Sequence, residues 1–166
     1  MSGLPSPNLS VQVYTHPDEF PAAVAALFDH SAAQSVEFGT SWFRNFVATV
    51  ALPDTKPSFY VLTLADRPMA SIPLQVRRSR IPGHRKIEAL GNYYTALYAP
   101  VLADGLDHRL LAVLLKRIAK DHAPIADMRF APMDPASSAY ALRLQALRKA
   151  GMSVHDLVKI TQYLVK

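Results

Sequence analysis

The stretch SFYVLTLADRPMASIPLQVRRSRIPGHRKIEALGNYYTALYAP, residues 58–100, decides the fold. It is the only long segment in which β-branched and aromatic residues are broken by repeated turn signals. Three strands are predicted in it, over residues 59–64, 69–77 and 87–90. Asp66-Arg67-Pro68 and Pro82-Gly83 supply the turns between them. We therefore expect an antiparallel meander whose apolar face is covered by helices.

Two features interrupt this meander. Pro73 has no N–H to donate to a strand ladder, so it marks an edge position or a bulge in the second strand. Gly91-Asn92 ends the third strand, and the residues after it are strand-like again over 93–102. The sheet is therefore expected to be disrupted near residue 92.

The rest of the chain alternates between helical and strand patterns. Outside the meander, strands are predicted over residues 11–14, 125–130 and 154–165, and helices over residues 19–30, 41–50, 106–121 and 134–151. This order defines a mixed α/β class. We expect residues 1–9 to be a flexible tail and residues 10–166 to be a single domain. The last predicted strand runs to the chain end without a closing turn.

Composition excludes several kinds of protein. The 166 residues, 18.3 kDa in all, are 50% apolar and 19% charged, which is typical of a globular chain. There is no cysteine, so a disulfide scaffold, a thiolate zinc site and a cysteine nucleophile are excluded. No apolar run approaches the roughly 20 residues of a membrane helix, and residues 1–10 do not form a signal peptide. These features predict a cytoplasmic protein without a membrane partner.

Positive charge gathers at one hairpin end. The net charge is +5, and five cations lie within ten residues: Arg77, Arg78, Arg80, Arg85 and Lys86. This cluster could bind phosphate, or it could keep a solvated strand edge basic and so prevent aggregation. We favour the second interpretation, and therefore expect no nucleic-acid partner.

Four segments carry a resemblance to a known family. They are Ser41-Trp42-Phe43 at a helix start, ASIPLQVRRSR at residues 70–80, LGNYYTALYAPVL at residues 90–102 and LRKAGM at residues 147–152. With the order of elements, they resemble the GNAT acyltransferase superfamily. They are most similar to the N-terminal half of tandem-domain, acetyltransferase-like bacterial proteins of cellulose and exopolysaccharide biosynthesis, which are relatives of Fem-type aminoacyltransferases. The resemblance spans about residues 37–152, and none of its motifs is catalytic.

The resemblance implies a fold and a function. The fold would be a GNAT-like, largely antiparallel sheet with helices on both faces, lacking its final strand in this chain. The chain would be the N-terminal, non-donor domain of an N-acyltransferase linked to polysaccharide or cell-envelope biosynthesis. Its partners would be a second GNAT-like domain in the same polypeptide and a small-molecule or glycan acceptor. The alternative is a non-catalytic binding module with a degenerate GNAT fold.

The turn that would hold the acyl donor departs from the family pattern. The resemblance implies a glycine-rich turn whose backbone N–H groups cradle the pyrophosphate of coenzyme A. Here the turn is LADGLD at residues 102–107, and Asp104 and Asp107 would repel a pyrophosphate. We therefore expect no cofactor in this chain, and place acetyl-CoA or another acyl donor in the second domain. Scattered histidines give no metal site.

The candidate substrate-binding residues flank the strand disruption. Asn92, Tyr93, Tyr94 and Tyr98 could line a pocket with hydrogen-bonding groups, at a place where folds of this family open to receive substrate. The alternative is that the tyrosines are ordinary aromatic residues of a strand. No catalytic residue is assigned. Glu37 and Glu88 are isolated carboxylates for which the sequence gives no charged partner.

Overall fold

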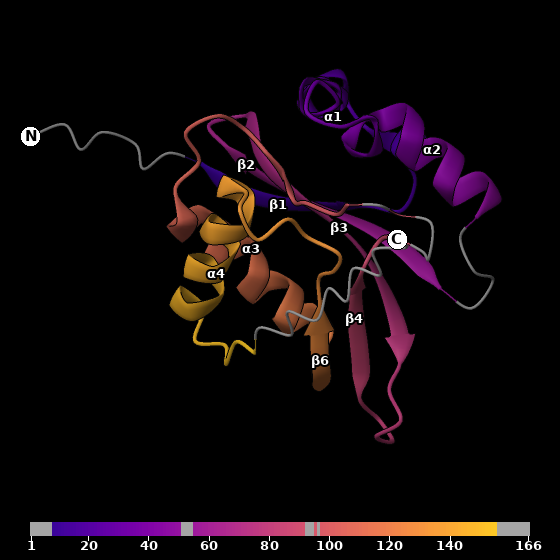
Figure 1. The fold of residues 1–166 in the computed structure, drawn as a ribbon, viewed down its shortest axis with the longest axis vertical. Coiled ribbons are helices and arrows are strands. Elements are labelled where there is room, and N and C mark those ends of the chain that lie inside the picture. The colour runs from indigo at the N-terminus through magenta and orange to yellow at the C-terminus, as the bar shows by residue number, and fades with distance from the viewer. Residues whose placement is uncertain (1–7, 51–54, 92–94, 96, 156–166) are drawn as a thin grey trace, which may run out of the picture.

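The computed structural model describes residues 8–50, 55–91, 95 and 97–155. Within them, one mostly antiparallel sheet lies between two pairs of helices (Figure 1), as the mixed α/β prediction requires. The strands are β1 Leu9–Tyr14, β2 Lys56–Leu64, β3 Arg67–Arg78, β4 Arg85–Ala89, β5 Val101–Leu102 and β6 Ile125–Arg129. The helices are α1 Ala22–Ser31, α2 Thr40–Thr49, α3 His108–Asp121 and α4 Ser138–Lys149, with short 3-10 turns η1 Pro17–Glu19 and η2 Val36–Phe38.

Strand β3 is the centre of the sheet. The strand order is β1-β2-β3-β4-β6, and β5 also pairs with β3. All these pairings are antiparallel except β4 with β6, which are parallel. Strand β4 pairs with residues 74–78 of β3, whereas β5 pairs with residues 70 and 71. Strands β4 and β5 therefore occupy one strand position in two halves, and the described residues between them, 90, 91, 95 and 97–100, are in no strand.

Pro73 faces the gap between these two halves. Its carbonyl oxygen accepts a hydrogen bond from the Leu90 N–H (3.2 Å), so its backbone is directed toward this edge of β3. Because proline has no N–H, no ladder bond can be donated from this position. Of the two positions that the sequence predicts for Pro73, an edge or a bulge, the structure shows an edge: a short unpaired length of β3 between β4 and β5. The register shift of β3 lies elsewhere, opposite Leu62 and Thr63 of β2.

Each face of the sheet has its own core. On one face, α1 and α2 cover Phe59 and Val61, and the rings of Phe20, Phe28 and Phe43 gather around Phe59 with centroids 4.8–6.1 Å apart. On the other face, α3 and α4 cover a larger apolar layer formed by Tyr60, Leu62, Ile72, Leu74, Ile87, Leu111, Leu114, Leu115, Ile118 and Leu147. The large buried residues of α3, Leu111, Leu114, Leu115 and Ile118, recur at the spacing that is typical of an amphipathic helix.

Trp42 is half-buried and stacks on Phe46 with ring centroids 5.1 Å apart. It lies beside the aromatic cluster on the α1/α2 face, which consists of Phe20, Phe28, Phe43 and Phe59. It therefore packs with the apolar side of α2, which fits a structural role better than a ligand-stacking one.

Local sequence signals lie at several element ends, although α4 begins at Ser138 and not at residue 134. Gly151 adopts φ +80° after α4, a conformation that favours glycine. The Ser137 hydroxyl caps the N-terminus of α4 by accepting a hydrogen bond from the Tyr140 N–H (3.1 Å). The first long helix begins at Ala22 rather than residue 19, because Phe20 precedes Pro21 and is held in an extended conformation.

Two strand predictions differ from the structure. Among the described residues, the strand expected over residues 93–102 is present only as Val101–Leu102, since Pro73 cannot donate a ladder bond beyond Ser71. Residues 92–94 and 96 lie outside the described part. Of the strand expected over residues 154–165, only residues 154 and 155 are described, and they are not in a strand. None of the helices in the described ranges is long and apolar enough to cross a bilayer.

The aromatic cluster should dominate the stability of the α1/α2 side. Phe59→Ala removes a ring that is 0% exposed, so we expect it to lower the free energy of unfolding by about 3–5 kcal/mol. Val36→Ala, at a side chain that is 73% exposed, should change it by less than about 0.5 kcal/mol. Urea unfolding of both variants checks this, and near-equal effects would contradict the packing described.

Candidate functional site

A groove runs along the outer edge of β5. Strand β6 pairs with β4 and not with β5, so this edge of β5 has no neighbouring strand among the described residues. The groove has a volume of about 260 Å³. One wall comes from α1 and η2, the other from the first turns of α4, and the floor from β5 and the turn after it. The lining residues are Ser31, Gln34, Phe38, Ala99, Pro100, Leu102, Ala103, Asp104, Gly105, Leu106, Ser138, Ala139 and Leu142.

The backbone of Leu102 is directed into this groove. The Ala103 N–H donates to the Met69 carbonyl (2.8 Å), so Ala103 and Met69 form a hydrogen-bonded pair between β5 and β3. In an antiparallel ladder, adjacent residues alternate in direction, so the N–H and C=O of Leu102 point away from β3. The groove thus presents one backbone donor and one acceptor to any extended ligand.

Negative charge lies at the mouth of the groove. The exposed carboxylate of Asp104 is 3.3 Å from Nε2 of His30. Asp107, in the same turn, caps α3 by accepting a hydrogen bond from the Arg109 N–H (2.7 Å). The side chain of Asp107 therefore occupies the helix N-terminus at which a phosphate would bind. This arrangement gives a physical basis for the expectation that the turn does not hold a pyrophosphate.

Tyr98 is buried beside the groove instead of lining it. Its hydroxyl donates to the Pro73 carbonyl (2.9 Å), and its N–H donates to the Pro132 carbonyl (2.6 Å). Its ring stacks on Phe130 with centroids 5.9 Å apart. Burial raises the pKa of the Tyr98 hydroxyl well above its ordinary value, so the hydroxyl keeps its proton and donates to Pro73.

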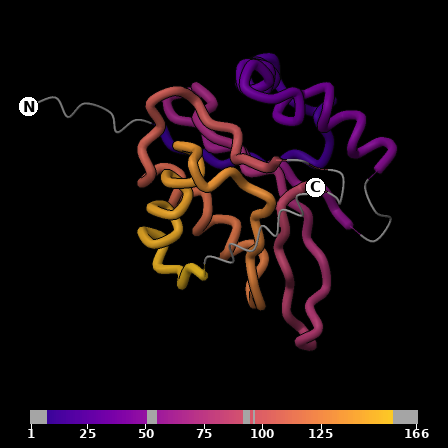
Figure 2. Tube along the Cα trace, in the orientation of Figure 1, coloured from indigo at the N-terminus to yellow at the C-terminus, as the bar shows by residue number. Residues whose placement is uncertain are grey.

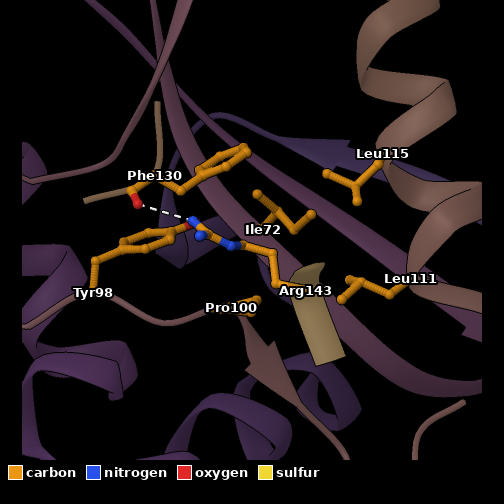
Figure 3. Close-up of a pocket in the computed structure, with 7 residues that line it drawn as sticks. All are labelled: Ile72, Tyr98, Pro100, Leu111, Leu115, Phe130 and Arg143. Atoms are coloured by element: carbon orange, nitrogen blue, oxygen red, sulfur yellow. Dashed lines mark hydrogen bonds between the residues drawn. The ribbon is translucent and has the colours of Figure 1, made fainter. Parts of the chain in front are cut away.

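Figure 3 shows the small cavity that Tyr98 does line. The guanidinium of Arg143 crosses it and donates to the Phe130 carbonyl (2.9 Å). Its volume is about 10 Å³, which leaves space for about one water molecule. Of the four predicted substrate-binding residues, Asn92, Tyr93 and Tyr94 lie outside the described part of the chain. The hydroxyl of Tyr98 holds the chain at residues 97–100 against β3 through its bond to Pro73.

Glu37 also holds this segment, a role that the sequence did not reveal. Its carboxylate accepts a hydrogen bond from the Leu97 N–H (3.0 Å). The Gln75 side chain donates to the Gly91 carbonyl (3.2 Å). Together with the bond from Tyr98 to Pro73, this contact ties the chain to β3 on both sides of the interruption. The partners of Gln75 and Glu37 are about 16 and 60 residues distant in sequence, and no local pattern indicates them.

Glu88, expected to lack a charged partner, is an ion-pair residue of the β3–β4 hairpin. Its carboxylate lies 2.7 Å from Nζ of Lys86 and 3.5 Å from a guanidinium nitrogen of Arg77. Burial raises the pKa of Glu88, but the hydrogen bonds and charges of Lys86 and Arg77 outweigh this and hold it below the ordinary value. That expectation was wrong because cross-strand partners depend on register.

A second cluster of titratable groups lies at the C-terminal end of α3. The Tyr60 hydroxyl donates to Asp121 (3.2 Å) and lies 3.0 Å from Nε2 of His122. Burial, together with the charge of Asp121, raises the pKa of Tyr60 to about 12. Burial also lowers the pKa of His122, although Asp121 opposes this shift. The residues of this cluster do not line the groove.

The described ranges contain no group of three or more His, Asp or Glu residues that could hold a metal ion. No family model, curated protein or solved structure matches this chain.

The Tyr98 hydroxyl should contribute measurably to stability. Tyr98→Phe removes a buried hydrogen bond to Pro73, so we expect the free energy of unfolding to fall by about 1–2 kcal/mol. Tyr14→Phe, which removes an exposed hydrogen bond to Gln12, is the matched control and should cost less than about 0.5 kcal/mol. If urea unfolding gives equal losses for the two variants, Tyr98 does not anchor the segment.

His122 should make stability depend on pH. Its pKa is lower in the folded state, so the unfolded chain binds more protons as the pH falls through the ordinary histidine range. Its contribution is therefore complete above the unfolded pKa of about 6.5 and declines as the pH falls below it. Between about pH 7.5 and 5.5, urea unfolding of His122→Asn should show a shallower decline than the wild type. A steeper decline in the variant would contradict this.

Proposed function

We propose that this chain is a GNAT-like acyltransferase domain that binds an acceptor and does not itself bind an acyl-CoA donor. The groove along the unpaired edge of β5, with a carboxylate and no cation in its lining, is the observation that carries this proposal. The order of elements and the parallel β4–β6 pair beside the interrupted strand support it further.

The lining of the groove favours a neutral or cationic acceptor. Apolar walls are combined with a few hydrogen-bonding groups: the hydroxyls of Ser31 and Ser138, the amide of Gln34 and the backbone of Leu102. Its volume is just below the range usual for ligand pockets, which suits a single sugar ring or an amine-bearing arm. Asp104 would attract an ammonium group and repel a phosphate.

The donor and the catalytic groups belong, in this proposal, to a second domain of the same fold. Such an arrangement corresponds to the tandem acetyltransferase-like proteins of polysaccharide biosynthesis that the sequence resembles. The acceptor would be a glycan or a small amine that is presented to the acyl group from this groove. Binding in the groove and transfer of the acyl group would then depend on different parts of the polypeptide.

A non-catalytic binding module is the second candidate. It is favoured by the basic end of the β3–β4 hairpin, which offers a binding surface for an anionic partner away from the groove. The two candidates differ in whether the groove binds a ligand, so they can be separated by a variant that fills it.

Ligand titration tests the proposal. We expect thermal unfolding to shift upward with glucosamine, N-acetylglucosamine or cello-oligosaccharides, and not with acetyl-CoA. Ala139→Trp fills the groove and should abolish the shift, whereas Ala141→Trp, on the exposed side of α4, should retain it. Saturable stabilisation by acetyl-CoA that Ala139→Trp removes would make the groove a donor site. A folded chain that responds to none of these ligands would favour the binding module.

A further inference from the structure

The β3–β4 hairpin ends in an exposed tip that is closed by hydrogen bonds. In Figure 2 the two strands run on together to residues 79–84, beyond β6 and the helices. Residues 81–84 form a turn in which the His84 N–H donates to the Ile81 carbonyl (3.1 Å) and Gly83 adopts φ +76°. The Ser79 N–H donates to the His84 carbonyl (3.2 Å) and closes the hairpin. This geometry leaves the Ile81 side chain 52% exposed at the end of the molecule.

Behind this tip, cations lie directly opposite one another. The strand register pairs Arg77 with Lys86 and Arg78 with Arg85. Directly opposed like charges destabilise a sheet. Glu88 offsets the first pair, but in the described part of the chain no carboxylate forms an ion pair with Arg78, Arg80 or Arg85. Residues 67–87 contain no Asp or Glu. The fold thus maintains a repulsion that an anionic partner would relieve.

Protection of a strand edge does not account for this charge. The outer edge of β4 is already covered, because Arg85 to Glu88 pair with β6. Within this hairpin, only the last residues of β3, beyond Val76, have an edge without a neighbouring strand in the described ranges. A basic residue there would protect that edge, but Arg85 and Lys86 would not be needed for this.

We propose that this hairpin docks the protein onto an anionic lipid bilayer. Ile81 and Pro82 would enter the headgroup region, and the cations behind them, on both faces of the hairpin, would contact lipid phosphates. An apolar tip with a ring of cations behind it suits a membrane surface better than a nucleic acid. Residues 61–92 contain no Phe, Tyr or Trp, the rings on which single-stranded bases most often stack. This inference replaces the expectation from the sequence that there is no membrane partner, and is independent of the groove.

Vesicle flotation tests this inference with the whole chain. We expect binding to vesicles of phosphatidylcholine with phosphatidylserine, and not to phosphatidylcholine alone, with a steep decrease as salt is added. Each cation near such a surface raises partitioning about fivefold, so Arg78→Gln/Arg80→Gln/Arg85→Gln should weaken binding about 100-fold. Ile81→Ser should weaken it several-fold, because the apolar contact is lost.

The matched control removes the same charge elsewhere. Arg109→Gln/Lys116→Gln/Lys120→Gln changes three exposed cations of α3 and should retain most of the binding. Thermal unfolding without lipid should show that the hairpin variant is folded and at least as stable as the wild type, since it removes the opposed Arg78–Arg85 charges.

Three results would overturn the inference. One is equal binding to neutral and anionic vesicles, and another is an equal loss of binding in the control variant. The third is salt-sensitive binding to duplex DNA, dependent on the same arginines, without binding to anionic vesicles. That result would assign the hairpin to nucleic acid instead.

Discussion

The organisation of this sheet depends on a hydrogen-bond donor that Pro73 lacks. Pro73 lies in the central strand and turns its backbone toward the β4/β5 edge, where no ladder bond can be donated. The neighbouring strand position is divided there into β4 and β5. The carbonyl oxygen of Pro73, which faces the same edge, accepts hydrogen bonds from the Leu90 N–H and from the Tyr98 hydroxyl. A single backbone constraint therefore interrupts the sheet between β4 and β5, and the same residue holds Leu90 and Tyr98 against β3.

The interruption also separates two surfaces of different chemistry. On the β5 side, the sheet edge is left without a strand, and helices from both layers form the walls of a groove with negative charge at its mouth. On the β4 side, pairing continues through β6, and the hairpin extends beyond the helices with opposed cations. A neutral or cationic acceptor in the groove and an anionic surface at the hairpin would not compete for the same residues. The two proposed ligands, an acceptor in the groove and an anionic bilayer at the hairpin, would thus bind at opposite ends of β3.

Much of the fold follows from local sequence signals, whereas the site does not. Apolar residues at helical spacing mark the buried sides of α1 and α3, and Gly151 lies just after the end of α4, although α4 begins four residues later than the sequence predicted. Pro73 was visible in the sequence, but its effect required knowing that its backbone faces the β4/β5 edge of β3. The groove is formed by residues from α1, β5 and α4 that are distant in sequence, and Glu37 holds Leu97 across 60 residues. Tyr98 was singled out from the sequence, yet its burial against Pro73 depends on tertiary packing.

Amide hydrogen exchange at Leu102 and Ala103 tests the central claim most directly. If β5 pairs with β3 as described and its outer edge faces the groove, the Ala103 amide is protected by its bond to Met69, while the adjacent Leu102 amide exchanges at nearly the rate of an unstructured peptide. Protection of both amides in the ligand-free chain would mean that another strand covers β5, and the groove would not exist. Rapid exchange at both would mean that β5 is not held in the sheet.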